Sequence, residues 1–246
     1  MHSGRSFSLL ATLLALAPTG ATARADSPAA NPVVVELFTS QGCSSCPPAN
    51  ANLAAIADRP DVLALSFGVT YWDYIGWKDT FAKPEFTNRQ YAYEQKLHRA
   101  TAYTPQMVVN GLLDVVGSQR NAVENALAQA AHPEAIELAV AGTDLQIHMP
   151  ALASKCNCLI TLFGFRSQVD TRVVAGENSG RTLREFQVVR LMRSLGRWKG
   201  DAQVLHTSLR GMPADIDGYA VVAQEGTGGR IIASGRSPLA SSTQGP

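Results

Sequence analysis

Residues 33–48 read VVVELFTSQGCSSCPP. The apolar, β-branched run at 33–38 predicts a buried strand, and residues 39–42 predict the tight turn that ends it. Proline is tolerated in the first turn of a helix, so we expect a helix over 43–57 with Leu53, Ile56 and Ala57 on one face. A second apolar run at 62–67 completes a strand, helix and strand pattern, which is typical of a parallel βαβ unit.

The rest of the first predicted domain is an insertion followed by a hairpin and a helix. Residues 71–100 form the insertion, helical over 85–99, where Phe86, Tyr93 and Leu97 share a face. Its many aromatics indicate either a cap packed on the sheet or a rim beside the functional site. The Asn110-Gly111 turn predicts a hairpin over 107–116. With a helix over 121–131, we expect an α/β domain at 26–134 built as βαβ, helical insertion and ββα.

The sequence pattern changes after residue 135, where short alternating runs are separated by Gly, Pro, Asp and Ser. This pattern predicts a small antiparallel β-sandwich-like domain over 135–238 and a disordered tail at 239–246. The expected strands are 136–140, 144–148, 159–165, 171–175, 186–189, 203–209, 219–224 and 230–233.

The first 25 residues have the pattern of a signal peptide. A basic start precedes an apolar stretch at 7–18 and the A-x-A signature Ala23-Arg24-Ala25. We expect cleavage after Ala25 and export to the periplasm or the medium; an uncleaved anchor or a disordered tail is the alternative. Loss of Arg5 and Arg24 turns 21 basic against 20 acidic residues into 19 against 20. The near-neutral charge argues against nucleic-acid binding, and no later run is long enough to cross a membrane.

Cys43 and Cys46 have the spacing that thiol–disulfide exchange requires. Exchange needs a thiolate and a second sulfur that releases a trapped mixed disulfide. At the start of a helix, unpaired N–H groups and the helix dipole would stabilise the Cys43 thiolate, and Cys46 would resolve the intermediate. Ser44 and Ser45 add hydroxyl donors but no charge, so the reduction potential stays open.

Two other interpretations of the pair remain, a metal site and an inert disulfide. A metal would need further ligands, and the nearest histidine after the predicted cleavage site, His98, is isolated. We therefore expect no metal and no cofactor beyond the disulfide itself. Thr104-Pro105 precedes a later strand; Pro105 is either a cis proline that faces the cysteines and leaves a backbone edge free for a substrate, or an ordinary trans proline.

Four motifs carry a resemblance to a known family. They are VELFTSQGCSSCPP at 35–48, YWDYIGWKD at 71–79, YTPQMVVNG at 103–111 and GENSGRTL at 176–183. The chain resembles a bacterial family of secreted thioredoxin-like proteins described as a domain of unknown function, over essentially its whole mature length. The resemblance implies a thioredoxin-like fold with a β-rich C-terminal part, a redox pair at Cys43 and Cys46, and a facing proline at Pro105. Where this family suggests F-H-V-D, residues 67–70 read FGVT, so a His and an Asp are missing.

Other residues could support or extend the pair. Glu36 is either a buried proton acceptor for Cys46 or a solvent-facing strand residue. Asp73, beside Trp72, could take part in exchange or serve as an ion pair or loop cap. Cys156-Asn157-Cys158 could form a second exchange centre, an electron relay or a soft-metal site, or have no function.

Two functions therefore compete. The first is an exported thiol–disulfide oxidoreductase, or a redox-partner protein, that acts on protein thiols or disulfides and draws on a membrane redox partner. The second is a periplasmic module that binds a metal or a partner on a thioredoxin-like scaffold. Cysteine cycling with a redox couple would distinguish them from each other.

Overall fold

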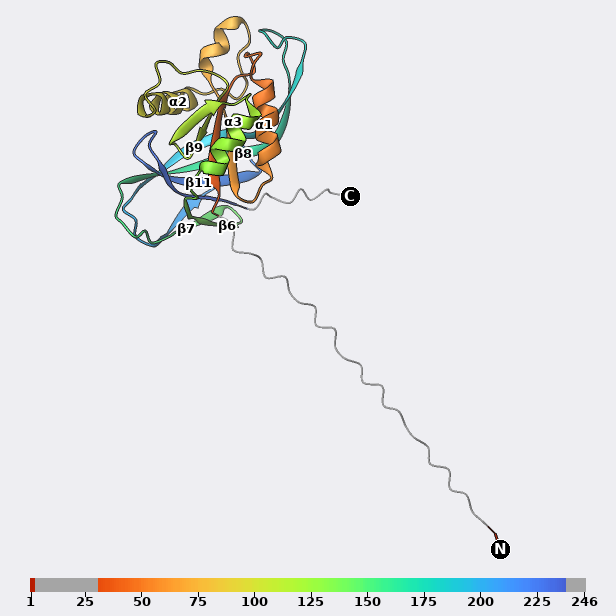
Figure 1. The fold of residues 1–246 in the computed structure, drawn as a ribbon, viewed down its shortest axis with the longest axis vertical. Helices are drawn as coiled ribbons and strands as arrows, with labels where there is room; N and C mark the ends of the chain where they lie inside the picture. The colour runs from red at the N-terminus through yellow and green to blue at the C-terminus, as the bar shows by residue number, and fades with distance from the viewer. Residues whose placement is uncertain (3–30, 238–246) are drawn as a thin grey trace.

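The computed structural model describes residues 1–2 and 31–237, so the predicted signal peptide beyond its first two residues and the predicted tail lie outside the described part. One mixed sheet has nine strands in the order β4-β3-β1-β2-β9-β8-β11-β12-β5, and a second has the order β10-β7-β6 (Figure 1). The elements are β1 (Val33–Thr39), α1 (Pro47–Ala57), β2 (Val62–Gly68), η1 (Thr70–Ile75), α2 (Pro84–Lys96), β3 (Gln106–Val109), β4 (Leu113–Val116), α3 (Arg120–Gln129), β5 (Glu134–Ala135), β6 (Glu137–Ala141), β7 (Asp144–Met149), β8 (Cys158–Arg172), β9 (Thr182–Trp198), β10 (Gln203–Ser208), β11 (Gly218–Glu225) and β12 (Ile231–Arg236).

The N-terminal half follows the predicted order of elements. β1 and β2 run parallel, and every residue of both strands is buried. Continuous apolar runs suit this position, because one face of the strands packs on α1 and α3 and the other on α2. β3 pairs antiparallel with β1 and with β4. Asn110 and Gly111 form the predicted hairpin turn, both with positive φ.

The insertion packs on the sheet through α2. Phe86 and Tyr93, two of the three residues predicted to share a face, are fully buried, and the third, Leu97, packs against the same cluster. This confirms the interpretation of α2 as a cap on the sheet. Within residues 31–237, no helix is both long and apolar enough to cross a membrane.

The prediction of short C-terminal strands is wrong for the central pair. The run at 159–165 and the first two residues of the run at 171–175 belong to one 15-residue strand, β8, and the run at 186–189 lies within the 17-residue β9. β9 also pairs parallel with β2 through Ser66 and Val188, so the large sheet passes through both predicted domains. Polar residues interrupt the alternation of apolar and polar positions in β8 and β9, and two register shifts bend this pair of strands. Because of both features, the sequence does not reveal how long the strands are.

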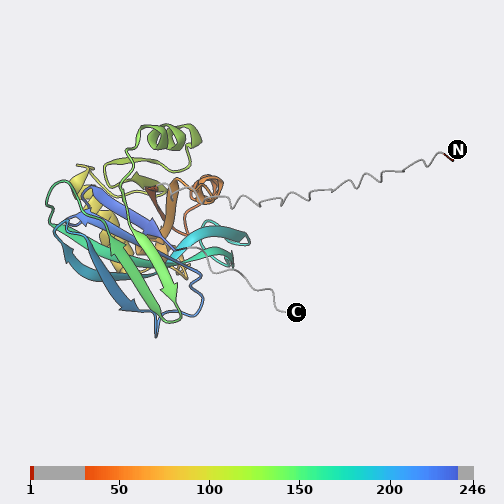
Figure 2. The same ribbon diagram turned by 90° about the horizontal axis from the view of Figure 1, so that it is seen from below.

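The small sheet covers one end of the large one. Apolar residues of β7, among them Leu145 and Ile147, share a buried cluster with Ile160, Leu162 and Val221 of β8 and β11. Figure 2 shows the two arrows of β6 and β7 against the blue C-terminal strands. The C-terminal half is therefore two-layered, but one of its layers is the continuation of the N-terminal sheet.

A buried ion pair lies on the α2 face of β1. Arg89 donates to both carboxylate oxygens of Glu36, at 2.7 and 3.0 Å, and Tyr93 donates to the same carboxylate. Glu36 is completely buried, and its strand neighbours Val34 and Phe38 pack with α2. The solvent-facing alternative for Glu36 is therefore wrong, and its predicted burial is confirmed, but its hydrogen-bond partners are Arg89 and Tyr93 rather than Cys46.

Arg89→Met tests how much this ion pair contributes to the unfolding free energy. The variant leaves the Glu36 carboxylate buried without its cation, so we expect a loss of about 3–5 kcal/mol in unfolding free energy. The double variant Glu36→Leu/Arg89→Met should lose less than Arg89→Met alone, because no charge then stays buried. Arg184→Met, which breaks an exposed pair with Asp170, is the control and should unfold like the unmodified protein. Equal losses of unfolding free energy in Arg89→Met and Arg184→Met, measured by urea unfolding, would contradict this prediction.

Candidate active site

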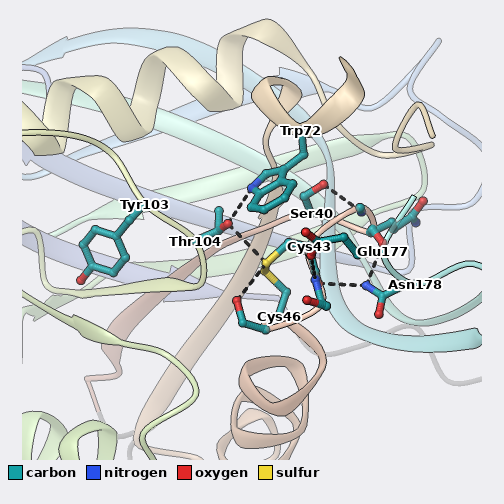
Figure 3. Close-up of a disulfide and its surroundings, with 12 residues drawn as sticks. Ser40, Cys43, Cys46, Trp72, Tyr103, Thr104, Glu177 and Asn178 are labelled. Atoms are coloured by element: carbon teal, nitrogen blue, oxygen red, sulfur yellow. Dashed lines mark hydrogen bonds between the residues drawn. A yellow bond between two sulfur atoms is a disulfide. The ribbon is translucent and has the colours of Figure 1, made fainter. Parts of the chain in front are cut away.

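Cys43 and Cys46 are joined as a disulfide in the turn between β1 and α1, with their Cα atoms 5.5 Å apart (Figure 3). The turn is closed by its own backbone. The amide of Cys43 donates to the carbonyl of Ser40 (3.1 Å), and the amide of Cys46 donates to the carbonyl of Cys43 (3.2 Å). The Ser40 hydroxyl accepts a hydrogen bond from the amide of Gly42 (3.1 Å). The strand therefore feeds directly into a turn that carries both sulfurs.

The helix begins later than predicted. α1 starts at Pro47, and Cys46 is its N-cap residue, so Cys43 precedes the first turn. Pro47 and Pro48 have no N–H to offer, and the next amide, of Ala49, already donates to the carbonyl of Cys46 (2.9 Å). The expectation that Cys43 faces unpaired helix amides is therefore wrong, because prolines occupy the positions that would supply them.

Hydroxyl groups surround the Cys43 sulfur instead. The Thr104 hydroxyl donates to Cys43 Sγ (3.4 Å), and the Ser45 hydroxyl lies 3.2 Å from the same atom. Trp72 Nε1 donates to the Thr104 hydroxyl (2.8 Å), and this bond orients the Thr104 proton toward sulfur. The structure thus brings together four of the residues singled out in the sequence: Cys43, Ser45, Trp72 and Thr104.

Pro105 lies next to this contact. The Thr104–Pro105 peptide bond is cis, so the trans alternative is wrong. Pro105 directly precedes β3, which pairs with β1 from Gln106 onward, and its carbonyl accepts a hydrogen bond from the amide of Gly117 (2.9 Å). β3 pairs with β1 on one side of Pro105, and Thr104 contacts the sulfur on the other. These contacts hold the segment around Thr104 and Pro105, the proline loop, beside the disulfide.

The disulfide is covered in this structure. Cys43 is 0% exposed and Cys46 is 1% exposed, although Ser44 and Ser45 between them are exposed. Trp72 and Ile75 of η1 pack against Gly42 of the turn, and Ile75 also packs against Gly176. A thiol from another molecule can reach the sulfurs only after these covering groups move.

The connection between β8 and β9 completes the site. Asn178 is fully buried, and its Nδ2 donates to the carbonyls of Gln41 (3.0 Å) and Cys43 (2.9 Å). The carboxylate of Glu177 accepts a hydrogen bond from the amide of Ser44 (2.9 Å). The sequence predicted no role for these two residues, because their contacts with the turn span more than 130 positions. Their only signal was the GENSGRTL motif at 176–183.

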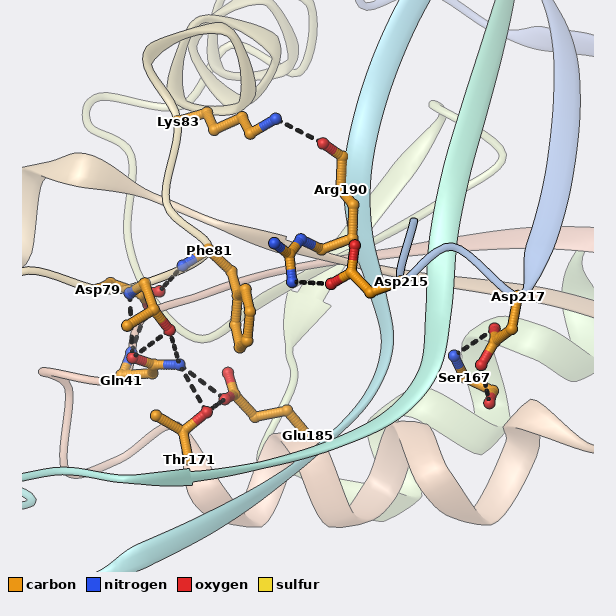
Figure 4. Close-up of polar contacts among 11 residues, drawn as sticks. Gln41, Asp79, Phe81, Lys83, Ser167, Thr171, Glu185, Arg190, Asp215 and Asp217 are labelled. Carbon is orange, nitrogen blue, oxygen red and sulfur yellow. Dashed lines mark hydrogen bonds and ion pairs between the residues drawn. The ribbon is translucent and has the colours of Figure 1, made fainter. Parts of the chain in front are cut away.

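A cluster of buried acids surrounds Gln41, two positions before Cys43 (Figure 4). The Gln41 amide donates to Asp79 Oδ2 (2.8 Å), and Gln41 Nε2 donates to Glu185 Oε2 (2.8 Å). Burial, with the charge of Asp79 nearby, raises the pKa of Glu185 to about 8, and burial also raises the pKa of Asp79. Asp73 accepts a hydrogen bond from the Asp79 amide (3.2 Å), which is the loop-cap role and not one at sulfur. Sequence reasoning missed Glu185 and Asp79.

The second cysteine pair is distant from the first. Cys156 and Cys158 are joined as a disulfide at the start of β8. Gln41 contacts β8 near its other end, at Thr171, so 13 residues, or roughly 40 Å of extended strand, separate the two regions. The two disulfides therefore lie near opposite ends of β8, and an electron relay between them stays a prediction. Cys156 lines a cavity of about 400 Å³, whereas Cys158 is fully buried.

Comparisons with known proteins give a family and two similar folds. The family described as "Protein of unknown function (DUF1223)" matches residues 34–224. A structural-genomics protein of Agrobacterium tumefaciens is similar with a TM-score of 0.76 and 28% identity, over 89% of this chain and 99% of that one. HBP35 of Porphyromonas gingivalis has a TM-score of 0.54 and 14% identity, over 88% of this chain and 79% of that one, a likeness of fold alone. No curated protein matches the chain.

The candidate metal ligands are dispersed. Within residues 31–237, no group of three or more His, Cys, Asp or Glu side chains is placed to hold a metal ion.

Glu185 should make the stability of the protein depend on pH. Its pKa is about 8 in the folded protein against 4.5 for an ordinary glutamate, so between these values only the folded state holds the proton. Stability therefore falls as the pH rises through this window. Glu185→Gln has no proton to lose, so its urea midpoint should change less between about pH 5 and pH 8 than that of the unmodified protein. Glu137→Gln, an exposed acid in β6, should keep the original slope; an unchanged slope in Glu185→Gln would contradict the assignment.

Proposed function

The chain belongs to the DUF1223 family, and we propose that it is an exported thiol–disulfide oxidoreductase, or the redox partner of one, on a thioredoxin-like scaffold. The observation that carries this proposal is the contact between the disulfide and the proline loop, in which Thr104 donates to Cys43 Sγ. A disulfide that only braced the turn would need neither a hydroxyl donor at its sulfur nor a tryptophan that orients that donor.

The two sulfurs have different parts in the exchange. A substrate thiolate attacks Cys43 Sγ, so that a substrate–Cys43 disulfide forms while the Cys43–Cys46 bond breaks and Cys46 leaves as a thiolate. Cys46 is the N-cap of α1 and directly follows the exposed residues Ser44 and Ser45. A second substrate thiol then attacks the substrate sulfur of the mixed disulfide and releases Cys43. The substrate is oxidised to a disulfide, and the protein is reduced by two electrons.

The second step releases Cys43 with a negative charge, and hydroxyl groups stabilise that charge. Ser45 and Thr104 both have a hydroxyl within hydrogen-bonding distance of that sulfur. Hydrogen bonds to an ionised group are stronger than hydrogen bonds to a neutral one, so these contacts strengthen as the thiolate forms. The same steps run in reverse when the protein reduces a substrate, and the potential of the partner sets the direction.

Protein thiols or disulfides are the proposed substrates, with a membrane redox partner as the source or acceptor of electrons. A cavity of about 310 Å³ lies next to the proline loop, lined by Tyr71, Tyr91, Glu94, Thr101 and Ala102. An extended substrate segment that pairs with the backbone before Pro105 would reach this cavity with a side chain. The predicted signal peptide would place the reaction in the periplasm or outside the cell.

Single-cysteine variants test the assignment of roles. Cys46→Ala leaves Cys43 beside two hydroxyl groups, so after reduction it should form a stable mixed disulfide with oxidised glutathione. Cys43→Ala leaves Cys46 beneath the turn and should react at least about tenfold more slowly. Mass spectrometry of the intact protein over time measures both rates. Equal rates in the matched pair, or no adduct in either variant, would count against the proposal.

Trp72→Ala tests whether the cover limits access. The variant removes the indole that binds Thr104 beside Cys43 Sγ. Dithiothreitol should therefore reduce the Cys43–Cys46 disulfide roughly tenfold faster, as expected for an opening free energy lower by about 1.4 kcal/mol. Tyr74→Ala is the matched control, because Tyr74 is in the same 3-10 helix but is 83% exposed. Its disulfide should be reduced at the original rate. A Trp72→Ala rate equal to that of Tyr74→Ala would show that Trp72 does not gate the sulfurs.

A further inference from the structure

We propose that Glu177, in the connection between β8 and β9, is a positioning residue that makes the Cys43–Cys46 pair more reducing than the turn alone would. The inference rests on the proposed function and extends it to regulation of the same site. It also gives a role to the GENSGRTL motif, to which the exchange reaction itself assigns none.

The connection is fixed against the cysteine turn. Buried Asn178 donates to the carbonyls of Gln41 and Cys43, and its own carbonyl oxygen accepts a hydrogen bond from Arg181 (3.2 Å). Gly176 has a φ of +75° and packs against Ile75, which also packs against Gly42 of the cysteine turn. The residue between Gly176 and Asn178 therefore has a fixed place, and that residue is Glu177.

Glu177 brings a negative charge to the amide next to Cys43. Its carboxylate accepts a hydrogen bond from the Ser44 N–H at 2.9 Å while the side chain stays exposed (Figure 3). Hydrogen bonding to the Ser44 side chain and amide lowers the pKa of Glu177, so the group is ionised at neutral pH. An amide that could have faced the Cys43 thiolate is thus bonded to a carboxylate.

The charge acts on only one of the two redox states. The disulfide is neutral, but reduction by a dithiol or by two glutathione molecules yields a thiolate at Cys43, the residue next to the Ser44 amide that the Glu177 carboxylate binds. Like charges repel, and the proline pair at 47–48 leaves no helix amides to offset the repulsion. The reduced form is therefore disfavoured, which lowers the reduction potential. Other titratable groups around the turn are Arg181, which donates to Asn178, and the acids Asp79 and Glu185 at Gln41.

Glu177→Gln removes the charge and keeps an oxygen that accepts the Ser44 hydrogen bond. We expect the equilibrium with reduced and oxidised glutathione to shift about threefold toward the dithiol form, the size expected for an exposed charge. Alkylation followed by mass spectrometry of the full mature chain measures the fraction reduced. Glu137→Gln makes the same charge change on β6, and its equilibrium should not shift.

Salt distinguishes electrostatic from structural action. At 1 M salt the Debye length is about 3 Å, so the difference between Glu177→Gln and the unmodified protein should shrink. A shift that persisted at high salt, or no shift at low salt, would overturn the role of Glu177 while the unmodified protein still cycled with glutathione. If Cys43–Cys46 of the unmodified protein did not cycle at all, the proposed function would fail, and this inference with it.

Discussion

The side-chain amide of Asn178 holds the backbone around the cysteines in place. The carbonyls of Gln41 and Cys43 point into the protein, and Asn178 Nδ2 donates to both. Buried carbonyl groups need hydrogen-bond partners, and a tight turn that closes on itself cannot supply them all. The partner comes from the connection between two long strands more than 130 residues away. The C-terminal half therefore helps to hold the turn in this shape.

The same dependence explains why the two halves share one sheet. β9 pairs with β2, and the β8–β9 hairpin extends past the sheet far enough to bring its connection over the turn. Gln41 repeats the link on the other side, since its side chain bonds Glu185 of β9 while its amide bonds Asp79 of the insertion. Three segments that are remote in sequence thus meet at residues 41–43. A change in any of them reaches the disulfide through hydrogen bonds rather than through the apolar core.

Local patterns in the sequence predicted the elements that depend on local chemistry. The apolar runs of β1 and β2, the Asn110-Gly111 hairpin and the buried face of α2 all follow from residues close together in the chain. Features that depend on distant partners were missed or wrong. The sequence predicted a proton acceptor for Cys46 or a solvent-facing residue at Glu36, because its cation, Arg89, is 53 positions away. The contacts of Asn178 and Glu185, and the length of β8 and β9, likewise depend on pairing that no short window contains.

The two disulfides show why cysteine spacing alone could not predict which pair takes part in thiol–disulfide exchange. When either bond is opened, one sulfur must leave as a thiolate. Cys158 would leave into a cluster of apolar side chains that includes Ile160 and Trp198, where loss of hydration disfavours the ion. Cys46 would leave at the N-cap of α1, and Cys43 would be released beside two hydroxyl groups. Burial alone does not separate Cys46 from Cys158, because both are buried; the polarity of their surroundings does. That difference favours exchange at the Cys43–Cys46 pair, even though the other disulfide has a cavity beside it.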